Sequence, residues 1–108
     1  MGKTKIYKIE GSEELSKYEL EGIEELGAKW LVYCYVHGNY DGEGFAVWEV
    51  DGKLYYHDME HCSCYGPTYG MSNNMPMDSI EDIEKFANNY NFGDEVVKFI
   101  KDKGLCKK

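Results

Sequence analysis

Hydrophobic and polar residues alternate in three consecutive segments between residues 30 and 58. In the first segment, WLVYCYVH (30–37), aromatic and β-branched residues occupy both sets of alternating positions, which is typical of a central strand. Asp51-Gly52 separates the second segment from the third, and this dipeptide tolerates the positive φ angles of a two-residue hairpin turn. The pattern therefore predicts a three-stranded antiparallel meander from Trp30 to Asp58.

Two weaker patterns precede this meander. The alternation within residues 3–9 predicts a short fourth strand at one edge of the sheet. Ser12 followed by two glutamates is typical of a helix N-cap with acids in the first turn. Apolar residues then recur at helical spacing, and we expect this N-terminal helix to end at Gly22 or Gly27.

Two helices are predicted after an irregular stretch. Asp78, with a glutamate three residues later, forms a capping-box pattern, and apolar residues continue at helical spacing over residues 78–90. A second apolar periodicity covers residues 94–103. Lysines in its last turn complement the helix dipole, and Gly104 is expected to end the helix.

Size and composition agree with one packed domain. The chain has 108 residues, of which 43% are hydrophobic and 15% aromatic, so it can bury a core and does not belong to the disordered class. We expect a single α+β domain over residues 1–108, a small antiparallel β-meander with an N-terminal and two C-terminal helices. We expect the helices to cover one face of the sheet.

The charge of the chain excludes one class of partner. The formal net charge is -8 and there is no arginine. Because nucleic-acid binding depends on neutralising phosphates, and arginine is the residue best suited to it, we expect no direct contact with nucleic acid. The sequence also shows neither a long apolar stretch nor the h-region of a signal peptide, so we expect no membrane association and a cytoplasmic location.

Acidic residues are concentrated near the N-terminus. Seven glutamates lie between Glu10 and Glu25, opposed only by Lys17. A solvated helix face is the simplest interpretation. The alternative is a surface that attracts a basic partner protein and speeds its association. Its candidate binding residues are Glu13, Glu14, Glu21, Glu24, Glu25, Asp41 and Glu43.

The segment HDMEHCSCYGP (57–67) contains several side chains that could bind a metal or act in catalysis. Its candidates are His57, His61, Cys62, Cys64 and Tyr65. Two histidines and two cysteines match the ligand number and softness that zinc prefers, but all four would come from one short loop, whereas zinc sites usually combine two separated pairs. We therefore expect no metal and no other cofactor. A thiol enzyme would need a cysteine activated by a neighbouring histidine, and this alternative stays open.

Part of the chain also resembles a known family. Tyr40–Ala46 matches a Y-x-G-x-G-[FY]-A pattern, and DGKLY and HCSCYG follow at 51–55 and 61–66. This combination resembles a family of small uncharacterised bacteriophage proteins. The resemblance implies that the protein is encoded by a phage, and it implies no activity.

These observations lead to a functional hypothesis with an alternative from another class. We expect a non-enzymatic phage accessory protein that binds and inhibits a basic host protein through its acidic surface, such as a nucleic-acid-handling nuclease of host defence, in the manner of an anti-CRISPR protein. The alternative is a small-molecule or metal binder, or a thiol enzyme, that uses the loop from His57 to Tyr65. A homodimer is left open.

Overall fold

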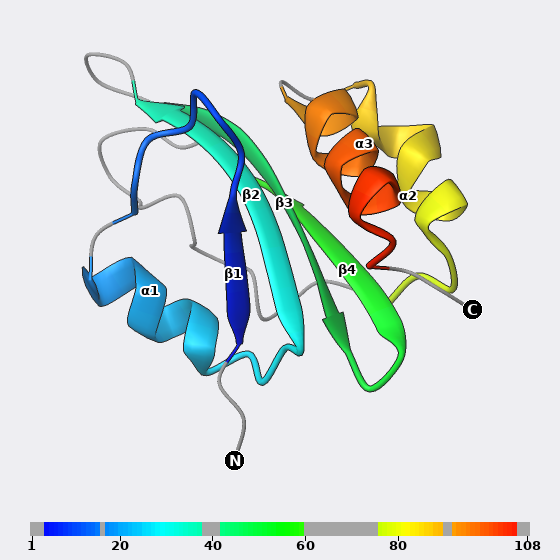
Figure 1. Cartoon of the computed structure of the whole chain (residues 1–108), viewed down its shortest axis with the longest axis horizontal. Coiled ribbons are helices and arrows are strands. Elements are labelled where there is room, and N and C mark those ends of the chain that lie inside the picture. Colours follow the sequence, from blue (N-terminus) through cyan, green and yellow to red (C-terminus); the bar gives the residue numbers. More distant parts are fainter. Residues whose placement is uncertain (1–3, 16, 38–41, 60–75, 90–91, 106–108) are drawn as a thin grey trace.

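A computed structural model describes residues 4–15, 17–37, 42–59, 76–89 and 92–105 (Figure 1). Four strands form one mixed sheet in the order β1-β2-β3-β4, and three helices accompany it, which confirms the α+β class. No helix within these ranges is long and apolar enough to cross a bilayer. The elements are β1 (Lys5–Lys8), α1 (Lys17–Glu24), β2 (Trp30–His37), β3 (Gly42–Val50), β4 (Lys53–Asp58), α2 (Ile80–Ala87) and α3 (Gly93–Lys103).

The antiparallel meander of β2, β3 and β4 is as the sequence predicts. β2 pairs with β3 from Trp30 opposite Glu49 onward, and β3 pairs with β4 up to Val50 opposite Lys53. Asp51 and Gly52 form the turn with φ angles of 52° and 84°. Two successive positive φ angles are those of a type I′ turn, whose twist matches that of the flanking strands.

The predicted N-terminal edge strand is present as β1, and it runs parallel to β2. Lys5 lies beside Trp30 and Lys8 beside Tyr33. Parallel neighbours need a crossover connection, and α1 provides it. The Thr4 hydroxyl donates to the Ala28 carbonyl oxygen at 2.8 Å, which ties the start of β1 to the segment that enters β2.

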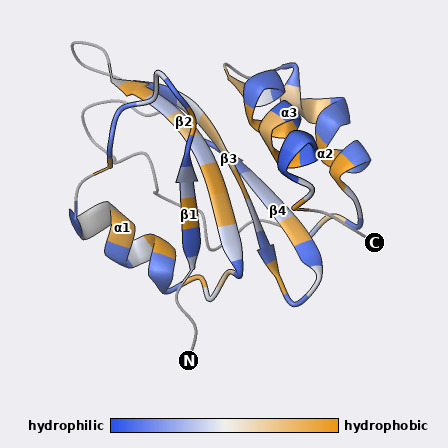
Figure 2. Ribbon diagram, viewed as in Figure 1, coloured by the Kyte–Doolittle hydropathy of each residue, from blue (hydrophilic) through white to orange (hydrophobic). Residues whose placement is uncertain are grey.

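Helices cover both faces of the sheet, so the expectation that they all pack on one face is wrong. One core joins α2 and α3 to one side of the strands, including Val32 and Val47. A second core joins Ile23 of α1 to the opposite side, including Leu31 and Trp48. Figure 1 shows α1 on one side of the sheet and the α2/α3 pair on the other, and Figure 2 shows apolar positions along the central strands. The physical reason is that β2 is apolar at every position from Trp30 to Tyr35, so both of its faces must be covered.

The two C-terminal helices form a tight pair with specific ends. Ser79, and not the predicted Asp78, is the N-cap of α2, and its side chain accepts a hydrogen bond from the Asp82 N–H. α3 ends at Gly104 with φ 67°, as expected for a left-handed C-terminal residue. At the start of α3, Gly93 packs against the backbone of Ala87, the last residue of α2, so closely that a Cβ would lie 1.9 Å from the Ala87 carbonyl oxygen. Only glycine allows this approach of the two helices.

Candidate functional site

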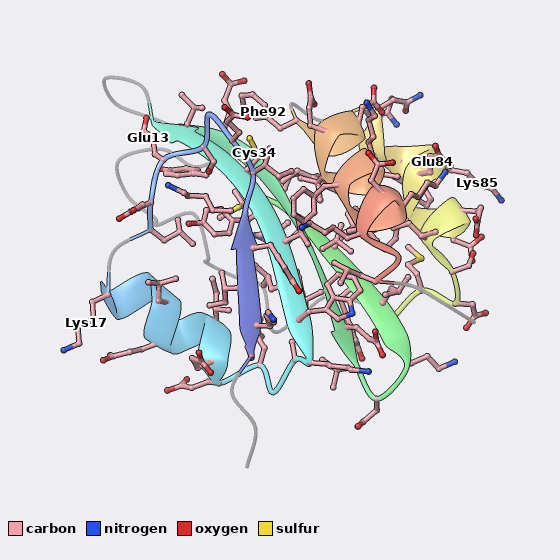
Figure 3. All side chains as sticks on the ribbon, viewed as in Figure 1. Glu13, Lys17, Cys34, Glu84, Lys85 and Phe92 are labelled. Atoms are coloured by element: carbon pink, nitrogen blue, oxygen red, sulfur yellow. The ribbon has the colours of Figure 1, made fainter. Side chains whose placement is uncertain are left out.

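Exposed carboxylates dominate the connection between β1 and β2. We call this set the acidic surface, and it comprises Glu10, Glu13, Glu14, Glu21, Glu24 and Glu25, all of which are exposed. The first three lie in the segment that follows β1, and the others lie on α1 or in the turn after it. Figure 3 places Glu13 and Lys17 on the side of the molecule opposite Glu84 and Lys85 of α2.

The segment that displays Glu13 and Glu14 is extended, so the predicted helix N-cap at Ser12 is wrong. The Ser12 hydroxyl oxygen accepts a hydrogen bond from the Tyr35 N–H at 2.9 Å, and the Glu13 N–H donates to the Tyr35 carbonyl oxygen at 2.7 Å. These bonds continue the sheet along β2 beyond the end of β1. A serine hydroxyl can satisfy backbone groups other than those of a helix start, and here it does so for β2.

Helix α1 turns its remaining glutamates outward because its apolar side is anchored in the second core. Ile23 is fully buried, and Leu15, just before the helix, is 6% exposed. One Glu24 side-chain oxygen accepts a hydrogen bond from the Thr4 N–H at 3.2 Å. Glu24 therefore also fixes the end of α1 against the start of β1, whereas Glu21 and Glu25 project from neighbouring positions of the same connection.

Few cations accompany the acidic surface. The Lys8 ammonium lies 3.6 Å from a Glu14 carboxylate oxygen, and the Glu14 side chain is 84% exposed. Lys17 is exposed at the first position of α1. An exposed ion pair of this kind contributes about 1 kcal/mol or less to the free energy of unfolding, and it neutralises only one carboxylate. The surface keeps an excess of negative charge that acts over roughly a Debye length in salt solution.

The two remaining acidic candidates differ in their placement. Asp41 lies outside the described residues. Glu43 is exposed on β3 opposite Val36 of β2, and the strand β2 separates it from the acidic surface. The glutamates that are close in sequence share one connection. Glu43 lies one strand away from them, next to Gly44, which pairs with the same Tyr35 that accepts the Glu13 N–H.

Of the five candidates in the segment from His57 to Tyr65, the structure describes one. His57 lies on β4 opposite Ala46 and is half-buried. His61, Cys62, Cys64 and Tyr65 lie outside the described residues. The hypothesis of a metal, small-molecule or thiol site in this loop therefore stays a prediction.

Cys34 is a free thiol in the middle of the first core. It is 4% exposed, and burial, followed by the negative charge of Glu95, raises the pKa of this thiol. Cys34 belongs to the first core, and Phe92, just before α3, packs against the same core; both are labelled in Figure 3. A thiol of raised pKa is protonated at neutral pH and is a poor nucleophile, so Cys34 acts as a small apolar side chain.

The described part of the chain contains no polar centre suited to a bound ion. No group of three or more His, Cys, Asp or Glu side chains could hold a metal within these ranges. Every buried side-chain nitrogen or oxygen there has a hydrogen-bond partner. A half-open groove of about 330 Å³ lies between α2 and α3, where the Lys101 ammonium donates to Glu84 at 2.8 Å and this bond raises the pKa of Lys101. The Glu84–Lys101 pair links the two helices across this groove.

Comparison with known proteins gives this site no precedent. The chain matches no model of a protein family, no curated protein and no solved structure. The resemblance to phage proteins stays a prediction, and the function has to be argued from the surface itself.

Sequence reasoning missed one exposed group of side chains. We call it the Lys5–Lys103 patch, and it consists of Lys5 and Tyr7 of β1 with Phe99 and Lys103 of α3. Each half has a local pattern, since alternate residues of a strand share a face and residues four apart share a helix face. The two halves are more than 90 residues apart in the chain, so only the tertiary structure brings them together.

The Ser12 hydrogen bond gives a direct test of how the acidic surface is held. We expect Ser12→Ala to lower the free energy of unfolding by about 1–2 kcal/mol, because it removes the acceptor of the N–H of buried Tyr35. Denaturant unfolding followed by circular dichroism measures this loss. Ser12→Thr, which keeps the hydroxyl, is the matched control, and equal stability of the alanine variant and the original chain would contradict the proposed bond.

Proposed function

We propose that the protein is a non-enzymatic accessory protein of a phage that binds and inhibits a basic host protein through the acidic surface. The target class that fits best is a nucleic-acid-handling protein such as a defence nuclease in the host cytoplasm. The single observation that supports this proposal is the concentration of exposed carboxylates between Glu10 and Glu25 on one connection of the fold.

The chemistry of this surface resembles that of a polyanion. A protein that grips nucleic acid presents lysines and arginines to successive phosphates. Carboxylates arranged along an extended segment and the following helix offer the same cations an alternative set of anionic partners. Such complementarity raises the association rate and gives specificity for basic surfaces.

The arrangement also separates binding from folding. Glu21 and Glu25 are exposed and have no ion pair in the described part of the chain, so their charges contribute little to stability. Glu24 differs because it accepts the Thr4 N–H. The residues best suited to a test are therefore Glu21 and Glu25, together with Glu14, whose exposed pair with Lys8 contributes little to stability.

We expect the triple variant Glu14→Lys/Glu21→Lys/Glu25→Lys to weaken target binding at least ~10-fold and to reduce the dependence of the association rate on salt. The target is first captured on the immobilised protein from a host lysate and identified by mass spectrometry. Binding of the purified target is then measured by biolayer interferometry at several salt concentrations. Duplex DNA should displace the protein if both occupy the same cations.

The matched control is Glu81→Lys/Glu95→Lys/Asp102→Lys, which changes the net charge equally on the exposed side of α2 and α3. Both variants should keep the circular dichroism spectrum of the original chain. Unchanged affinity and unchanged salt dependence of the first variant would overturn the proposal. So would an equal loss in the control variant, because the effect would then reflect net charge alone.

A further inference from the structure

The outer edge of β1 has open hydrogen-bonding groups. The Lys5 N–H donates to the Lys29 carbonyl oxygen at 3.2 Å, and the Ile9 N–H donates to the Tyr33 carbonyl oxygen at 3.1 Å. Because alternate residues of a strand direct their backbone groups to opposite sides, the N–H groups of Ile6 and Lys8 face away from β2. Within the described residues neither of them has a hydrogen-bond partner.

The Lys5–Lys103 patch lies beside this edge, on the face of the sheet that α3 covers. The Tyr7 and Phe99 rings are half-buried, and their centroids are 5.6 Å apart with an interplanar angle of 56°. The Lys5 ammonium lies 5.9 Å from the centre of the Tyr7 ring, and the Lys103 ammonium lies 5.6 Å from that of Phe99. Two exposed cations are thus held over an aromatic pair by cation–π attraction.

These two lysines are without acidic partners in a protein of net charge -8. Lys8, Lys53, Lys85 and Lys101 each lie within 4 Å of a carboxylate oxygen. Neither Lys5 nor Lys103 has such a contact with any described residue. Their charges are available to an external carboxylate.

We propose that the outer edge of β1 and the Lys5–Lys103 patch together form a docking site for an extended acidic segment of a partner protein. The segment adds as a fifth strand beside β1, and its backbone pairs with the open groups of Ile6 and Lys8. Every second side chain of the added strand lies on the face of Tyr7, where its carboxylates meet the two lysines.

The charges of the edge select this occupant. Lysines on an edge strand oppose pairing with neutral or basic strands, because their desolvation would go uncompensated. An acidic strand supplies the compensating charge. A second copy of the chain would instead bring another excess of negative charge to the same edge. The two proposals meet at Lys8, whose ammonium lies 3.6 Å from a Glu14 carboxylate oxygen of the acidic surface. The docking site uses the backbone N–H of Lys8 and the acidic surface uses carboxylates, so each proposal has its own test.

The test uses a fluorescein-labelled peptide of alternating glutamate and valine, about eight residues long. We expect saturable binding to the whole protein by fluorescence anisotropy, loss of that binding in ~1 M salt, where the Debye length is about 3 Å, and no binding of the counterpart peptide with lysine in place of glutamate. Absence of saturable binding, or equal binding of the two peptides, would overturn the proposal.

Two variants locate the binding. Lys5→Glu/Lys103→Glu should weaken it at least ~10-fold, whereas Lys53→Glu/Lys85→Glu, with the same net charge, should not. Lys8→Pro removes the outward N–H, which an edge strand tolerates, together with the Lys8 side chain and its ion pair with Glu14, and it should abolish binding. Lys8→Ala loses the same side chain but keeps the N–H, and it should retain binding. Circular dichroism verifies that each variant is folded.

A different occupant would give a different pattern. If sedimentation shows that the protein alone is a dimer and that Lys8→Pro makes it monomeric, the edge binds a second copy and the acidic-segment proposal is wrong. If Lys5→Glu/Lys103→Glu binds the acidic peptide as well as the original chain, the patch has no part in docking and the proposal is equally wrong.

Discussion

Replacing Gly93 with alanine should lower the free energy of unfolding by about 3 kcal/mol or more. The added Cβ would lie 1.9 Å from the carbonyl oxygen of Ala87 and 2.6 Å from its carbonyl carbon. Both atoms belong to the backbone at the end of α2, so no side-chain rotation can relieve the overlap. The two helices would have to move apart, and the first core, which includes Val96 and Ile100, would lose contacts. Urea unfolding monitored by tryptophan fluorescence measures the effect.

The matched control is Gly22→Ala. Gly22 is exposed within α1 and an added Cβ meets no atom within 4 Å. Since alanine is the better helix former, this change should raise the free energy of unfolding by about 0.5–1 kcal/mol. If Gly93→Ala were as stable as the original chain, the close approach of α2 and α3 described above would be wrong.

Replacing Ile23 with alanine should lower the free energy of unfolding by about 2–5 kcal/mol. Ile23 is fully buried from α1 in the second core, together with Leu31 and Trp48 of the sheet. Truncation leaves a cavity where the helix meets the strands, and the surrounding β-sheet is too constrained to fill it. Chemical denaturation of the original chain and of Ile23→Ala under the same conditions gives the difference in their free energies of unfolding.

Val36→Ala is the control for Ile23→Ala. Val36 lies on β2 and is 37% exposed, so its truncation should alter the free energy of unfolding by less than about 1 kcal/mol. An Ile23→Ala variant as stable as Val36→Ala would show that α1 is not anchored through Ile23. The assignment of α1 to the face opposite α2 and α3 would then fail.

Local patterns were sufficient for the elements whose contacts are local. The hairpin between β3 and β4 follows from Asp51-Gly52, because few other dipeptides accept two consecutive positive φ angles. The helix from Ile80 and the end of α3 at Gly104 follow from apolar spacing and a terminal glycine. The N-cap of α2 was assigned one residue too early, since Asp78 and Ser79 are both good caps and only geometry distinguishes them.

The predictions that were wrong failed because contacts between distant parts of the chain decided the structure. Ser12 satisfies the sequence rule for an N-cap, but the Tyr35 N–H at the edge of β2 is a better partner for its hydroxyl. The apolar residues on both sides of β2 already indicated two covered faces, and the assumption of a one-sided sheet concealed this. The parallel orientation of β1 could not be predicted, because four residues with weak alternation fit either direction.

In the candidate site, too, the local features follow from the sequence and the tertiary contacts do not. The exposure of Glu13, Glu14, Glu21 and Glu25 follows from their sequence, since a run of glutamates is rarely buried. The hydrogen bond that fixes Glu24 to Thr4 could not be predicted, nor could the meeting of Tyr7 with Phe99, because both join segments that only the folded chain brings together.

The parallel pairing of β1 with β2 has a consequence for the order in which the molecule assembles. Contacts within the meander join residues close in sequence, so closing its loops costs little chain entropy. β1 finds its place only after the whole crossover, from Ile9 through α1 to Lys29, has been closed around it. Because the glutamates between Glu10 and Glu25 lie on that crossover, we expect the protein to take on its negatively charged side only after the meander has formed.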